Sequence, residues 1–101
     1  MLFRSRLIEV SVREDGIAIE GHAGYAEAGK DIVCAGVTAL TQTLIKSIED
    51  LTSDKIRYDI MPGKADIYFR NLSEAGKLLM DSFFLGICQI VADFPEYVKI
   101  L

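Results

Sequence analysis

Tryptophan is absent from this 101-residue chain, and histidine, proline and cysteine are scarce, at one, two and two residues. Two cysteines on different predicted elements form neither a disulfide framework nor a Cys-x-x-Cys redox pair. His22, Cys34 and Cys88 are also too few, at unsuitable spacing, for a metal site. We therefore expect reduced thiols, a cytoplasmic location, and no metal or other cofactor.

Basic residues are in deficit, because 11 Lys and Arg stand against 15 Asp and Glu for a net charge of −4. A nucleic-acid binder normally carries a basic face, so we expect no nucleic-acid partner, and a basic protein partner suits the charge. Long uninterrupted apolar runs are missing as well, since polar residues break the best candidate, 78–94. We expect no membrane span. The charged and apolar alternation over 1–12 indicates a strand rather than a signal peptide.

Half of the residues are hydrophobic, and their periodicity runs almost from end to end. The length suits a single domain over residues 1–101 with one core. The expected elements, in order, are strand 3–12, a turn at Glu14-Asp15-Gly16, strand 17–21, helix 32–51, strand 56–60, a turn at Met61-Pro62-Gly63, strand 64–70, a helix capped by Asn71 or Ser73 and ending near Asp93, and a short strand or docked tail over 97–101. The order β-β-α-β-β-α, with a possible short C-terminal strand, predicts a two-layer α+β domain with its helices packed on a mainly antiparallel sheet.

The two predicted helices differ in how their apolar residues are distributed. The first, with Asp31 as N-cap, carries one stripe at the helical period: Val33, Val37, Leu40, Leu44, Ile48 and Leu51. The second is apolar on more than one face between Leu78 and Val91, with Cys88 expected in the core. Surplus apolar surface in so small a domain favours burial against another chain. We expect a homodimer, with a peptide-binding groove as the alternative.

Chemistry concentrates between the only histidine, His22, and Cys34 in the first turn of the predicted helix. The unpaired amides and the positive end of the helix dipole favour a thiolate at Cys34, and the free amides are candidates for an oxyanion hole. His22 closes the second predicted strand beside Gly21, where it is placed to exchange a proton with the thiol. Cys34 lies at the margin of the apolar stripe, on the same flank as Thr38 and Thr41. The interpretation of such a pair as structural stands beside the catalytic one.

The residues between the pair have less specific roles. Asp31 is first a helix cap, and orientation of His22 is its second candidate role. The small residues around Gly24 and Gly29 leave room for a substrate backbone, and we expect the loop 23–30 to order when substrate binds. Tyr25 is a candidate loop anchor or a candidate lid that contacts substrate.

The segment from Gly21-His22-Ala23-Gly24-Tyr25-Ala26 through Gly29-Lys30-Asp31-Ile32-Val33-Cys34-Ala35-Gly36-Val37-Thr38-Ala39-Leu40 resembles the signature of the bacterial ribosomal-processing cysteine protease family. The resemblance implies a homodimeric endopeptidase that removes a short N-terminal extension from large-subunit ribosomal protein number twenty-seven. By position it implies Cys34 as nucleophile and His22 as its base, in an enzyme without a cofactor. Thr38 stands where many members have Ser, so a hydroxyl is kept.

Two other hypotheses remain open from the sequence. The first is a non-catalytic ribosome-assembly or peptide-binding module that keeps the Cys-His pair as structure. The second is a redox-sensing thiol, in which Cys34 forms a reversible adduct without peptide cleavage. Alkylation of Cys34 near neutral pH separates an activated thiol from an inert one.

Overall fold

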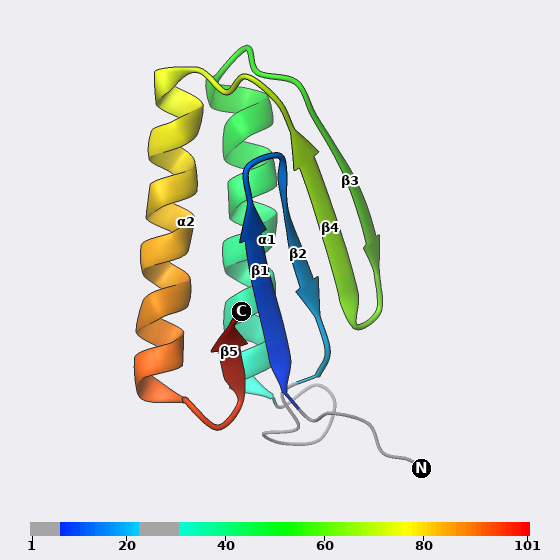
Figure 1. Cartoon of the computed structure of the whole chain (residues 1–101), viewed down its shortest axis with the longest axis vertical. Helices are drawn as coiled ribbons and strands as arrows, with labels where there is room; N and C mark the ends of the chain where they lie inside the picture. Colours follow the sequence, from blue (N-terminus) through cyan, green and yellow to red (C-terminus); the bar gives the residue numbers. More distant parts are fainter. Residues whose placement is uncertain (1–6, 23–30) are drawn as a thin grey trace.

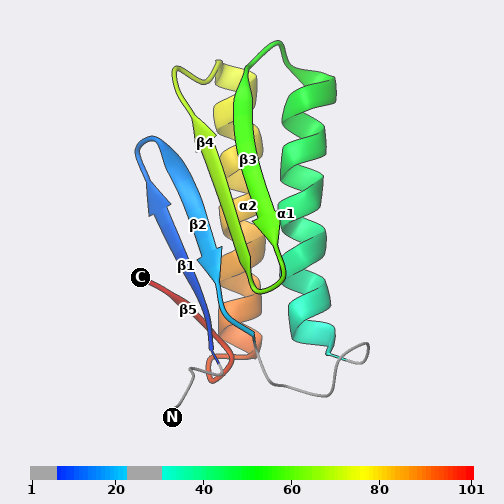
Figure 2. The same cartoon turned by 90° about the vertical axis from the view of Figure 1, so that its right-hand side faces the viewer.

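A five-stranded sheet, covered on one face by two helices, makes up the computed structural model, which describes residues 7–22 and 31–101 (Figures 1 and 2). The elements are β1 (Ile8–Arg13), β2 (Gly16–Glu20), α1 (Ile32–Leu51), β3 (Ile56–Met61), β4 (Lys64–Phe69), α2 (Glu74–Asp93) and β5 (Val98–Ile100). The strand order is β3-β4-β2-β1-β5, with β5 parallel to β1 and every other neighbouring pair antiparallel. The predicted two-layer α+β class and order of elements are confirmed, and the C-terminal segment is a strand.

Two tight turns fix the register of the hairpins. Arg13 pairs with Gly16, so Glu14-Asp15 alone forms the first turn and Gly16, which was predicted in the turn, begins β2. Met61 pairs with Lys64, so Met61 is the last residue of β3 rather than part of the second turn. The described part of the predicted strand 3–12 begins at Ile8 and extends to Arg13. Each correction shifts a boundary and leaves the hairpins in place.

The first helix begins where its cap predicts, because the Asp31 side chain accepts hydrogen bonds from the amides of the first turn. Its buried residues are Val33, Val37, Thr41, Leu44, Ile45 and Ile48. Leu51, predicted in the apolar stripe, is 72% exposed because it is the last residue of the helix, where the chain turns away toward β3. Thr41 tolerates burial because its hydroxyl donates to the Val37 carbonyl oxygen at 2.8 Å.

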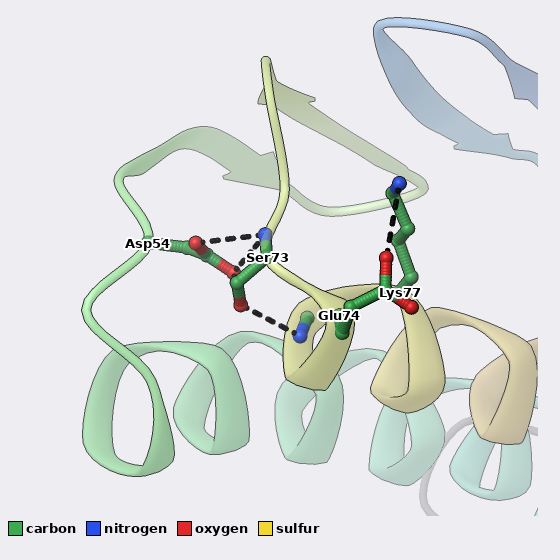
Figure 3. Close-up of polar contacts among 5 residues, drawn as sticks. Asp54, Ser73, Glu74 and Lys77 are labelled. Carbon is green, nitrogen blue, oxygen red and sulfur yellow. Dashed lines mark hydrogen bonds and ion pairs between the residues drawn. The ribbon is translucent and has the colours of Figure 1, made fainter.

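The start of the second helix is tied to the end of the first (Figure 3). Ser73 caps α2, its hydroxyl oxygen accepting from the Gly76 amide at 3.1 Å. The Asp54 carboxylate, from the segment between α1 and β3, in turn accepts from the Ser73 amide at 3.0 Å and from the Ser73 hydroxyl at 2.8 Å. Asn71, the alternative predicted cap, instead takes a left-handed φ of 54° in the turn before the helix.

The second helix buries only part of its apolar surface. Phe83 and Ile87 enter the core against the sheet, whereas Leu78 and Leu85 are 69% and 70% exposed. The core prediction for Cys88 is wrong: it is only partly buried, and among the described residues it belongs neither to the core nor to the partly buried residues packed against the core. By length and composition alone α2 is also apolar enough to cross a membrane, contrary to the expectation that no segment would be. That is weak evidence, because core helices pass the same test.

Candidate active site

The end of β2, the β3–β4 turn and the start of α1 lie toward the same end of the molecule (Figure 2). A cleft is lined by residues from all three places. Its volume is about 230 Å³. Chemically functional side chains and apolar ones line it together: Ile8, Ile19, Gly21, His22, Cys34, Val37, Thr38, Thr41, Gln42, Ile60, Met61, Gly63, Lys64 and Ala65. The fold therefore brings His22 and Cys34, twelve positions apart in the sequence, to one cleft.

Cys34 is the third residue of α1 and is half-buried, packed against the core on one side. Its neighbours along the helix that also line the cleft are Val37, Thr38 and Thr41. This is the margin position that the helical period predicts, with the two threonines on the same flank. A thiol in this position is held by packing while remaining adjacent to space that a substrate can enter.

The backbone amides in the first turn of α1 are not free to form an oxyanion hole, contrary to what the sequence suggests. One carboxylate oxygen of Asp31, Oδ1, accepts from the Val33 amide at 3.0 Å and from the Cys34 amide at 2.9 Å. The prediction of free amides at these two positions is therefore wrong, because the cap itself occupies them. The carboxylate also places a negative charge at the positive end of the helix, which offsets part of the dipole's effect on Cys34. The cap role predicted for Asp31 is confirmed.

His22 is exposed, and it directly follows Gly21, whose backbone is constrained by two neighbouring segments. The Gly21 amide donates to the Gly63 carbonyl oxygen in the β3–β4 turn at 2.8 Å. Gly21 has a φ of 112°, and a side chain there would overlap the carbonyl oxygen of Leu7, the residue before β1. Both features require glycine, so the backbone leading into His22 is fixed by the sheet rather than left to a loop.

The sequence did not reveal the contribution of the β3–β4 hairpin. Ile60, Met61, Gly63 and Lys64 line the cleft, and only the Pro62-Gly63 turn signal marks this region. Gly24, Tyr25 and Gly29, predicted to face the substrate, lie outside the described residues. Within residues 7–22 and 31–101, no three His, Cys, Asp or Glu side chains are grouped so as to hold a metal ion.

A half-buried thiol at a helix start, sharing one cleft with an imidazole, is typical of a cysteine-dependent hydrolase. The profile of the protein family described as "Cysteine protease Prp" matches residues 7–99. The chain belongs to this family and is a cysteine protease. It is similar to the ribosomal processing cysteine protease Prp of Staphylococcus aureus (strain Mu50 / ATCC 700699), with 26% identity over 100 residues that cover 92% of this chain and 94% of the relative.

Solved structures of this family share the fold. The crystal structure of the S. aureus processing protease Prp with a covalently linked product peptide superimposes with a TM-score of 0.84, at 22% identity over 93% of this chain and 95% of that one. The complex of the S. aureus protease with a substrate peptide gives a TM-score of 0.79, at 20% identity over 94% and 96%. The described sheet and helices are therefore those of the family.

Proposed function

We propose that this protease removes the N-terminal extension of large-subunit ribosomal protein twenty-seven, with Cys34 as nucleophile and His22 as general base and acid. The observation that carries the proposal is the shared cleft of about 230 Å³ lined by both side chains. The order of the two residues along the chain, and the glycines around them, match the signature of the family.

The proposed mechanism has two stages. His22 takes the thiol proton, and the Cys34 Sγ attacks the carbonyl carbon of the scissile peptide bond to give a tetrahedral intermediate. As this collapses, His22 protonates the leaving amine, the C–N bond breaks, and a thioester remains on Cys34. Water then attacks the thioester with His22 as base, which releases the new carboxylate and returns the proton to the thiol.

The character of the cleft supports a peptide with apolar side chains as substrate. Its apolar lining combines core residues from the sheet and α1 with Ile60 and Met61 from the tip of the hairpin, which are 48% and 51% exposed. The net charge of −4 favours association with a basic ribosomal protein. The names of the relatives, which describe a ribosomal processing activity, support this class of substrate.

We further propose that the enzyme works as a homodimer in the cytoplasm, where ribosomal proteins are made. The support for a dimer is the exposed pair Leu78 and Leu85, which lie seven residues apart on one face of α2. Two leucines at this spacing form a self-complementary strip, as a twofold interface requires.

The decisive experiment is incubation of purified protein with the N-terminally extended ribosomal protein, followed by mass analysis. We expect a single cut in the extension by the wild type and none by Cys34→Ala or His22→Ala. Cys88→Ala is the matched control, because it removes the other thiol on a helix outside the cleft, and it should keep wild-type turnover.

Other outcomes would contradict specific parts of the proposal. Cleavage by Cys34→Ala would remove this residue as nucleophile, and near wild-type turnover by His22→Ala would remove the histidine from the mechanism. An intact substrate, combined with alkylation of Cys34 no faster than that of a model thiol, would favour a non-catalytic module. A reversible Cys34 adduct without any cleavage would favour a redox-sensing thiol.

A further inference from the structure

The tip of the His22 ring lies against a residue that has no side chain. A methyl group built on Gly63 would lie 2.6 Å from Nε2 of His22, 3.1 Å from Cε1 and 3.4 Å from Cδ2. The first separation is far below van der Waals contact, so the imidazole occupies the space that any other residue at position 63 would fill. We infer that Gly63 is a positioning residue for His22, and that its missing side chain defines where the imidazole lies in the cleft.

The sheet topology explains why these residues meet although they are distant in the sequence. β2 pairs with β4, and the last pair of their ladder is Glu20 with Lys64. One residue further on, the Gly21 amide donates to the Gly63 carbonyl oxygen, which extends the pairing past the end of both strands. His22 therefore follows directly after a residue whose amide is bound by the Gly63 carbonyl oxygen, and its ring lies beside the Cα of Gly63.

Turn geometry alone also favours glycine at this position, because the φ of Gly63 is 77°. The requirement of the turn for a positive φ and the requirement of the His22 ring for space can be tested separately. Asn enters the left-handed region more readily than Ala does, yet both place a Cβ at the same point against the ring. If only the turn matters, Asn should substitute well for Gly. If the imidazole matters, Asn and Ala should fail alike.

The catalytic consequence rests on the proposed function, in which His22 exchanges protons with Cys34. A ring displaced from Gly63 by a methyl group loses its place in the cleft that it shares with the thiol. A shift of about 1 Å in a reacting group lowers the rate by about 100-fold. The loss should fall mainly on kcat, because Ile60, Met61 and the other apolar residues that line the cleft are unchanged in Gly63→Ala and Gly63→Asn.

The experiment compares Gly63→Ala and Gly63→Asn with Pro62→Ala, which alters the same turn without adding atoms beside the ring. We expect both Gly63 variants to lose about 100-fold in kcat while KM changes by less than about threefold. We expect Pro62→Ala to keep the wild-type kcat. Thermal unfolding of all three variants measures the structural cost separately.

A spectroscopic measurement reports the ring position without any turnover. Because His22 is the only histidine, the tag-free protein gives one set of imidazole Cε1–H and Cδ2–H resonances. In the wild type and in Pro62→Ala we expect nuclear Overhauser contacts from the Gly63 Hα protons to these ring protons. In both Gly63 variants the ring resonances should shift.

Each result decides the inference. Absence of the Gly63–His22 contact in the wild type would overturn it, even if a Gly63 variant failed to fold. Recovery of kcat and of the ring resonances in Gly63→Asn alone would assign the glycine to the turn and overturn it as well. If His22→Ala keeps full turnover, the proposed mechanism fails, while the Overhauser contacts and resonance shifts still decide whether Gly63 places the ring.

Discussion

Replacement of Leu85 by Asp tests the proposed dimer at the centre of the exposed face of α2. Leu85 is 70% exposed in the single chain, so the substitution removes no core contact and should leave the fold intact. In a twofold interface each protomer contributes the same residue, and the change therefore acts twice. We expect Leu85→Asp to convert the dimer to a folded monomer.

The magnitude follows from the exposed fraction. Full burial of a leucine side chain stabilises by about 1.5–3 kcal/mol, so burial of the exposed 70% contributes about 1–2 kcal/mol per copy. Two copies give about 2–4 kcal/mol, which raises the dissociation constant by about 30- to 1,000-fold. Desolvation of the two introduced carboxylates adds to this loss.

Sedimentation equilibrium over a range of protein concentrations measures the effect, with circular dichroism as the check on folding. Leu51→Asp is the matched control, because Leu51 is 72% exposed but belongs to the end of α1. A wild type that sediments at 11.2 kDa at micromolar concentration would refute the dimer. A Leu51→Asp variant that dissociates as much as Leu85→Asp would refute the assignment of the interface to α2.

Three further substitutions test the local energetics. Ser73→Ala should lower the free energy of unfolding in urea by about 1–2 kcal/mol, because it removes the cap of α2. It should leave kcat/KM unchanged, because the cleft lies at the other end of the helices. Gly36→Ala should raise the free energy of unfolding by about 0.5–1 kcal/mol, because alanine favours the helix over glycine. A methyl group at this position inside α1 would meet only the end of the Ile90 side chain, at 3.4 Å. An unfolding midpoint below that of the wild type would contradict this. Asp31→Ala should cost about 1 kcal/mol in urea unfolding, because the Val33 and Cys34 amides lose the carboxylate oxygen that accepts from both, and an unchanged unfolding midpoint would contradict this.

Local signals in the sequence were sufficient for the type and order of the elements and for the start of each helix. Asp31 and Ser73 have side chains that satisfy the first amides of a helix, so both helices begin where these residues predict. The short turn sequences fixed both hairpins to within a residue. Leu51 was misplaced because helical periodicity gives a face but does not say where along the helix the packing ends. Cys88 was misplaced because α2 is apolar on more than one face, so its sequence does not single out the buried one.

The order of the strands depends on contacts between distant segments, for which no local pattern exists. Nothing in β2 indicates that β4 becomes its neighbour, or that β5 pairs in parallel with β1. The contact between Gly63 and His22 is a direct consequence of that order, so the sequence presented Gly63 only as a turn residue. The pair of Cys34 and His22 was predicted because His22 is the only histidine, Cys34 lies in the first turn of a capped helix, and the contiguous family signature includes both residues.

The prediction of an oxyanion hole at the start of α1 was wrong for a different reason. Two roles predicted from the sequence, Asp31 as helix cap and the first-turn amides as oxyanion hole, exclude each other. An N-cap carboxylate stabilises a helix by accepting from the amides of the first turn, and an oxyanion hole built from the same amides needs them vacant. Asp31 was assigned the first role, which excludes the second while the cap is closed. Stabilisation of the tetrahedral intermediate by the Cys34 amide would therefore require the negative substrate oxygen to displace the carboxylate. Otherwise, the donors must come from another segment that borders the cleft.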